Sequence, residues 1–107
     1  MQNNLLVNPV IITTPMAASY KAATATQGPA GLGSFSYLRI EKVIWESPAV
    51  VGNIVAIKDP ASGAILLPMT CEAAGISQVF DWTAKPRRWS DFIVTNLDSG
   101  TLYIYLA

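Results

Sequence analysis

Turn-forming residues recur along the chain from Phe35 onward, and they constrain the fold class more firmly than any other feature. "SPAVVG", "DPASG" and "LDSG" separate short runs that are rich in β-branched and aromatic residues. A spacing of about 8–12 residues between turns is typical of antiparallel sandwiches and barrels. No long segment has a helical period of apolar residues. We therefore expect an all-β domain over residues 35–107, and a chain of 107 residues suits one hydrophobic core.

The first expected strand is "SYLRIEKVIWE", in which apolar and polar residues alternate. Strict alternation places two sets on opposite sides of this strand: Leu38, Ile40 and Ile44 on one side, and Tyr37, Arg39, Glu41, Val43 and Trp45 on the other. Lys42 interrupts the apolar side, which suggests a strand near a sheet edge. Trp45 stands at the end of the strand, and it is the tryptophan that we expect in the core.

Two more strands are expected in the middle of the chain, followed by a third after a loop. "NIVAIKD" and "AILLPM" would form a hairpin around "DPASG", with Pro68 at the end of its strand or at a non-pairing position. "ISQVFDW" is expected to be a strand, with Ile76, Gln78, Phe80 and Trp82 on one side. "TAKPRRWSD" is interpreted as a polar connection that holds the basic cluster of the chain.

The last two strands give the clearest hairpin signal in the chain. Residues 90–96 and 101–106 are the two strands, and residues 97–100 are the turn between them. Alternation in the second strand would turn Leu102, Ile104 and Leu106 toward the core. Tyr103 and Tyr105 would then face outward, where they pack across strands or against a partner chain.

Residues 1–34 differ in composition and are expected to form an extended N-terminal arm. This segment has one charged residue, Lys21, and is rich in Ala, Thr, Ser and Gly. Prolines at positions 9, 15 and 29 exclude a continuous helix. "LLVNPVIITT" would be extended, at a sheet edge or paired with another chain. The remainder is either disordered or lies along a neighbouring surface.

The charge content is low and balanced, and this bears on possible partners. Charged residues make up 13% of the chain, about half the usual share, and seven basic residues balance seven acidic ones. Such a chain has no long-range field that would gather nucleic acid or anionic lipid. Weak mutual repulsion also protects a free monomer poorly. We therefore expect part of the surface to be covered by other subunits; a compact β domain with few charges is the alternative.

The residues that carry most enzyme chemistry are scarce. Histidine is absent and Cys71 is the sole cysteine, so triads that contain histidine, an internal disulfide and a structural zinc site are excluded. A pair of carboxylates remains conceivable, but Asp59 and Asp98 stand in turns, where aspartate commonly shapes the backbone. No run of about 18 apolar residues and no signal-peptide pattern occurs. We expect no enzyme activity, cofactor, metal or membrane span.

The basic segment "AKPRRW" has three possible interpretations. It is a solvated loop with Trp89 packed on the domain edge, an interface anchor, or a weak nucleic-acid patch. Three basic residues near two aspartates are thin evidence for phosphate binding, so no nucleic-acid partner is expected. The residues expected at interfaces are Leu5, Val7, Val10, Ile12, Tyr20, Arg87, Arg88, Trp89, Tyr103 and Tyr105.

The order of these elements resembles that of small structural proteins of tailed bacteriophage virions. The resemblance covers residues 35–107 and rests on "YLRIEKVIWE", on "NIVAIKDPASG" and on the ending "LDSGTLYIYL". It consists of strand and turn patterns, and no catalytic motif accompanies it. It implies a β-sandwich or jelly-roll body, and it leaves the N-terminal arm unmatched.

The resemblance also implies a function, which is that of a capsid decoration (cement) protein. Its partner would be the major capsid protein, and its location the capsid surface of a virion assembled in the host cytoplasm. Our own hypothesis for its assembly is a homotrimer about a local symmetry axis. The alternative locations within the virion are the tail, the collar and the head-fibre attachment point. A different class of function is a carbohydrate-binding module with Trp82 and Trp89 as the sugar platform.

Overall fold

The computed structural model describes residues 3–24 and 37–106, and almost all of its regular structure is β-strand. The elements in chain order are β1 (Val10–Ile12), α1 (Tyr20–Thr24), β2 (Leu38–Glu46), β3 (Ile54–Lys58), β4 (Ile65–Thr70), β5 (Gln78–Asp81), β6 (Arg87–Trp89), β7 (Ile93–Leu97) and β8 (Thr101–Leu106). The predicted all-β class is confirmed. Within the described ranges, α1 is the one helix, and it is five residues long.

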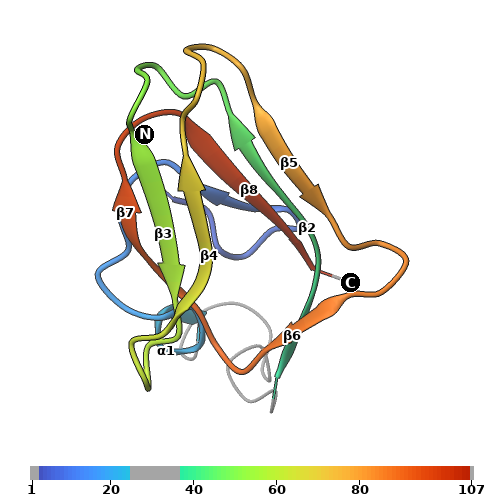
Figure 1. Ribbon diagram of the computed structural model, residues 1–107. Helices are drawn as coiled ribbons and strands as arrows, with labels where there is room; N and C mark the ends of the chain where they lie inside the picture. Colours follow the sequence, from blue (N-terminus) through green and yellow to red (C-terminus); the bar gives the residue numbers. More distant parts are fainter. Residues whose placement is uncertain (1–2, 25–36, 107) are drawn as a thin grey trace.

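The strands form two antiparallel sheets (Figure 1). Sheet A has the order β1-β8-β2-β5, and the short β6 also pairs with β2. Sheet B has the order β4-β3-β7. Strands that are distant in sequence are therefore neighbours in space, most clearly β1 beside β8.

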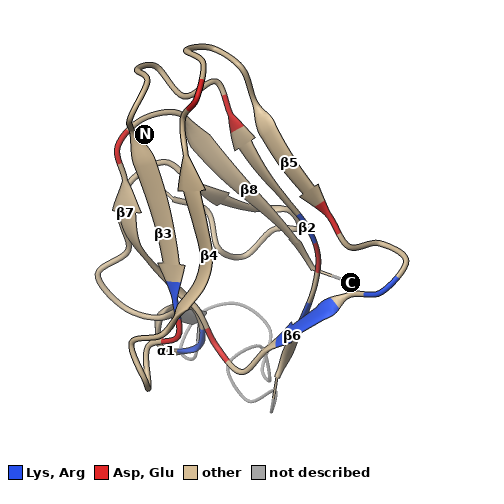
Figure 2. Cartoon of the chain, viewed as in Figure 1, with Lys and Arg blue, Asp and Glu red and all other residues tan. Residues whose placement is uncertain are grey.

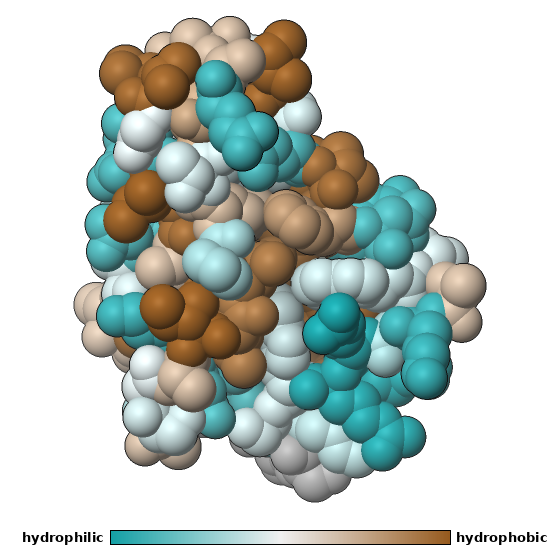
Figure 3. Space-filling view, viewed as in Figure 1, coloured by the Kyte–Doolittle hydropathy of each residue, from teal (hydrophilic) through white to brown (hydrophobic). Residues whose placement is uncertain are grey.

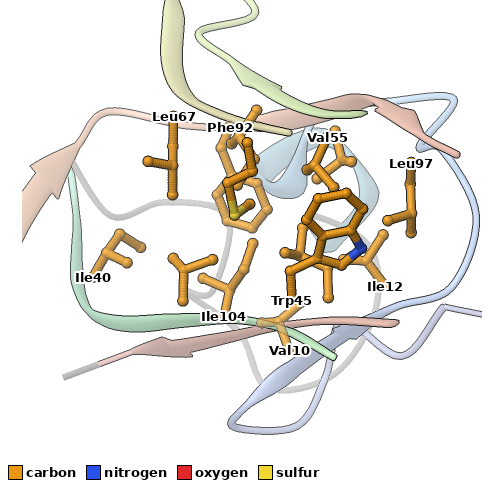
Figure 4. Packing of buried hydrophobic residues seen from close by; sticks show 14 of the residues in the cluster. Val10, Ile12, Ile40, Trp45, Val55, Leu67, Phe92, Leu97 and Ile104 are labelled. Atoms are coloured by element: carbon orange, nitrogen blue, oxygen red, sulfur yellow. The ribbon is translucent and has the colours of Figure 1, made fainter. Parts of the chain in front are cut away.

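Side chains from both sheets meet in a single hydrophobic core (Figure 4). Trp45, Ile104 and Val10 enter it from sheet A, while Val55 and Leu97 enter it from sheet B. Trp45 has no exposed surface, which confirms the prediction that this tryptophan belongs to the core. Because interiors are packed as densely as organic crystals, this shared core fixes how the two sheets face each other.

The side-chain alternation predicted for β2 is wrong in its second half. The pairing of β2 with β8 shifts register between Ile40 and Lys42, as happens at a β-bulge. The extra residue turns Val43 and Trp45 to the same side as Ile40, and all three are fully buried. Ile44, predicted to face the core, points to the opposite side.

One predicted hairpin is present and the other is not. β3 and β4 pair around the "DPASG" turn, as predicted, and Pro68 lies within β4, an edge strand of sheet B. The final hairpin prediction is wrong, because β7 pairs with β3 in sheet B while β8 pairs with β1 and β2 in sheet A. Residues 97–100 thus connect the two sheets.

Two further segments differ from the sequence-based expectation. "TAKPRRWSD", expected to be a polar connection, contains β6, which pairs with the first residues of β2. "ISQVFDW" contains β5 as predicted, with Phe80 and Trp82 partly buried and Val79 exposed. The pairing of both segments with β2 places the basic residues beside one strand.

The N-terminal segment contributes four buried side chains to the core, which corrects the prediction of an extended arm: Val10, Ile12, Met16 and Tyr20. Of the two alternatives for "LLVNPVIITT", the sheet edge is the one observed. β1 pairs with β8 of the same chain at the edge of sheet A, and Val10 and Ile12 are fully buried. Tyr20 is 98% buried and stacks on Phe92, with ring centroids 5.1 Å apart. Pairing with β8 removes the apolar side chains of β1 from water, whereas an extended arm would leave them exposed. Residues 25–34 of the predicted arm lie outside the described residues.

Candidate functional site

The described residues hold no group of three or more metal-ligating side chains, and no helix among them is long and apolar enough to cross a membrane. The aspartates of the turns bond to backbone. The Asp59 carboxylate accepts a hydrogen bond from the Ala61 N–H at 2.9 Å, within its own turn. The Asp98 carboxylate accepts one from the Ile54 N–H at 2.9 Å and so joins its turn to the start of β3.

Four of the residues predicted at interfaces lie in the core instead. Val10, Ile12, Tyr20 and Trp89 are all buried within the single chain, so their side chains are covered by this chain's own residues. Trp89 packs edge-on against Trp82 and forms part of an aromatic chain that continues through Phe92. Its burial also removes it from the surface that the expected sugar platform requires.

The other predicted interface residues keep some access to solvent. Leu5 is half-buried against the core, and Val7 is exposed. Tyr103 and Tyr105 are half-buried on the outer face of sheet A, and Arg87 and Arg88 are exposed on β6.

An apolar row crosses the outer face of sheet A. Strand register places Tyr103 opposite Ile11 on β1 and opposite Ile44 on β2, and Ile44 opposite Val79 on β5. We call these four residues, one from each strand, the apolar row. All four point away from the core because their neighbours in sequence point into it. Val79 is 56% exposed and the other three are half-buried.

A polar line borders the apolar row. Lys42 lies opposite both Tyr105 and Asp81 across its two neighbouring strands. Its Nζ atom is 5.5 Å from the centroid of the Tyr105 ring, at the distance of a cation–π contact. Hydrogen bonds from the Thr83 hydroxyl and N–H, together with the charge of Lys42, lower the pKa of the Asp81 carboxyl. An apolar centre with charged margins is the usual anatomy of a protein interface.

Sequence reasoning missed Ile11, Ile44 and Val79 as members of this row. The sequence pattern places Ile44 on the same side of its strand as Leu38 and Ile40, because the β2 bulge leaves no mark in the pattern of residue types. Ile11 was read as part of an arm. The alternation of "ISQVFDW" places Val79 and Phe80 on different sides of their strand, and this is the one sequence signal for the outward position of Val79.

The outer face of sheet B is different in character. Lys58 is the one charged residue within β3, β4 and β7, and the ribbons of this sheet are almost free of charge in Figure 2. Small and polar residues, among them Ala56, Thr70 and Thr95, stand between the apolar ones. Figure 3 shows the hydrophobic side chains of this view in separate groups rather than in one row. Scattered exposed apolar residues are normal for a soluble surface.

Comparisons with known proteins find no relative: no family model, no curated protein and no solved structure matches the chain.

Proposed function

We propose that the chain is a structural protein of a bacteriophage virion, namely a capsid decoration protein that binds and stabilises a shell of major capsid protein. The resemblance of residues 35–107 to small virion proteins suggests this role. The observation that carries it is the apolar row, a continuous surface that serves contact rather than chemistry. The proposal assigns no catalytic step, cofactor or nucleic acid to the chain, and it places the protein on the capsid surface.

The strand order supports the jelly-roll part of the proposal. In a jelly roll the first and last strands are neighbours in one sheet, and the second strand lies beside the next-to-last in the other. Here β1 lies beside β8. The segment after β1 lies along β7, since the Met16 N–H donates to the Val94 carbonyl and the Tyr20 N–H to the Phe92 carbonyl, each at 2.8 Å. We interpret this segment as an irregular second strand that completes a β-sandwich.

The apolar row is suited to a flat partner such as a shell. Its four members lie on four adjacent strands, so they form one band across a sheet rather than a pocket. Interface centres are depleted in charge and enriched in tyrosine, and the row with Tyr105 beside it has that composition. A trimer that presents three such bands would bind a symmetric shell with added avidity.

The direct experiment is binding of the purified chain to undecorated capsids of the same virus. Co-sedimentation is expected to saturate at hundreds of copies per particle, because a shell repeats its binding sites over the whole surface. Saturation at a single ring of copies would favour the tail, the collar or a fibre attachment point instead. Absence of the chain from both capsids and complete particles would refute a virion role.

A further inference from the structure

The connections at one end of the molecule form a single acidic surface. Residues 46–53, 71–77 and 97–100 are joined by hydrogen bonds. The Gly75 N–H donates to the Pro48 carbonyl at 2.7 Å, and the Ala49 N–H donates to the Ser99 hydroxyl at 2.8 Å. We call these three connections the loop end. Its charged residues are Glu46, Glu72 and Asp98, all exposed, and it has no basic residue.

The loop end also carries exposed apolar side chains. Val50 and Val51 are 57% and 62% exposed, and Ile76 on the neighbouring connection is 62% exposed. Figure 3 shows hydrophobic groups at the end where these connections lie. Large apolar residues held on hydrogen-bonded loops and bordered by carboxylates fit the anatomy of an interface.

A basic surface lies at the other end of β2. Arg39 and Arg88 are direct partners across β2 and β6. Both point outward, since Leu38 and Trp89, which form the next pair, are buried. Like charges placed opposite each other destabilise a sheet. Within the described residues, neither guanidinium has a carboxylate at ion-pair distance.

An aromatic ring holds Arg88 of this surface in place. The Arg88 guanidinium is 4.7 Å from the centroid of the Tyr37 ring. Arg87 lies on the other face of β6, opposite Ile40, and its guanidinium is 4.8 Å from the Trp82 ring. Such contacts order a long side chain and leave its outer N–H groups free to bind a carboxylate. We call Arg39 and Arg88, with Tyr37, the arginine surface.

The two surfaces are well separated and opposite in charge. Arg39 and Glu46 stand near opposite ends of β2, about 23 Å apart along an extended strand. In Figure 2, acidic segments lie at the end where β2 finishes, and the basic segments of β6 lie toward its other end with acidic segments near them. Figure 3 shows hydrophilic side chains gathered over the region of β6. A chain with zero net charge thus carries two separate surfaces that are complementary in charge.

We propose that copies of this chain associate head to tail, with the loop end of one copy bound to the arginine surface of the next. One molecule carries both halves of the contact, and this identifies a second copy as the partner. Carboxylates of the incoming loop end would relieve the repulsion between Arg39 and Arg88, and its exposed valines would cover Tyr37. Because the two surfaces differ, the contact is heterologous and yields a closed ring or a filament. It concerns the chain alone and does not depend on a virion role.

The test is a charge-swap complementation followed by analytical ultracentrifugation. One variant carries Arg39→Glu and Arg88→Glu, and the other carries Glu46→Lys and Glu72→Lys. Asp98 is left in place because its carboxylate bonds to β3. Each variant is expected to be monomeric while the wild-type chain forms oligomers. A mixture of the two is expected to assemble again, because the unaltered surfaces of the two variants are complementary and the two altered surfaces are also opposite in charge to each other.

A matched control and a salt series complete the test. Lys58→Glu changes one charge on sheet B, outside both surfaces, and should leave wild-type assembly intact. Raising the salt concentration from about 0.05 to 0.5 M should weaken the wild-type association by tenfold or more, because exposed charges are then screened. Circular dichroism verifies that each variant is folded. A wild-type chain that stays monomeric at low salt, folded variants that still assemble, or a mixture that does not associate would each overturn the proposal.

Discussion

The indole nitrogen of Trp45 donates a hydrogen bond to the carbonyl oxygen of Ser99 at 2.8 Å. This bond links the end of β2, in sheet A, to the connection that carries the chain from β7 in sheet B to β8 in sheet A. The same connection contains Gly100, whose φ of 74° belongs to the left-handed region. The crossover between the sheets is therefore held by the buried Trp45 side chain and by the left-handed backbone conformation of Gly100.

Trp45→Phe should destabilise the fold by about 2–3 kcal/mol, because it removes the indole bond and leaves part of a fully buried site empty. Urea unfolding followed by circular dichroism measures the change. Trp82→Phe is the matched control, since Trp82 is only partly buried and should lose less. Equal losses in the two variants would contradict the role given to the Ser99 bond.

Gly100→Ala should cost about 3 kcal/mol or more. A Cβ atom at this position would collide with the carbonyl oxygen of Glu46 and lie 3.0 Å from the indole nitrogen of Trp45. Gly63→Ala is the control, because Gly63 has a similar φ of 76° but open space around it, and should cost only about 1–2 kcal/mol. The difference between the two thermal unfolding midpoints isolates the steric contact, and indistinguishable midpoints would show that it is absent.

Ile12→Ala should destabilise the protein by about 2–4 kcal/mol, since Ile12 is fully buried in the shared core. Its neighbour Ile11 lies on the outer face of the same strand, so Ile11→Ala should cost less than about 1 kcal/mol. Chemical denaturation of both variants provides the comparison. If both substitutions were neutral, β1 would not belong to the core.

Alkaline pH should weaken the fold through Tyr20. Burial raises the pKa of its phenol above the ordinary value of 10.0. The unfolded chain therefore loses this proton at a lower pH than the folded chain, and the stability from the neutral phenol is complete below pH 10 and falls as pH rises above it. Tyr20→Phe should show a smaller decrease between about pH 9 and 12 in denaturant titrations. If Tyr20→Phe left the pH dependence of stability unchanged, ionisation of the Tyr20 phenol would not be the cause of the alkaline weakening.

The sequence predicted the strands well because their signals are local. The alternation in "TLYIYL" placed Leu102 and Ile104 in the core, and the "DPASG" turn placed β3 beside β4. Residues of alternating character within six positions are enough for such predictions, because neighbouring side chains of a strand point to opposite faces.

What the sequence could not supply is decided by contacts between distant segments. The register shift in β2 depends on its pairing with β8, and it reverses the orientation of Ile44. The residue types at positions 97–100 suit a turn in either case: when the flanking strands pair with each other, and when they belong to two different sheets. The positions of Val10 and Tyr20 in the core depend on Ile104 and Phe92, which follow them by 94 and 72 residues. The sequence therefore indicated only part of the candidate surfaces, namely Tyr103, Tyr105, Arg87 and Arg88.

Capsid binding by two charge variants tests the central claim, that the apolar row is the surface that a neighbouring molecule covers. Val79→Lys places a charge in the row, and Thr95→Lys places the same charge on the outer face of sheet B, at an exposed position. We expect both variants to fold, Val79→Lys to bind undecorated capsids at least tenfold more weakly than the wild-type chain, and Thr95→Lys to bind as the wild type does. Equal binding by all three proteins, or a loss confined to Thr95→Lys, would contradict the account.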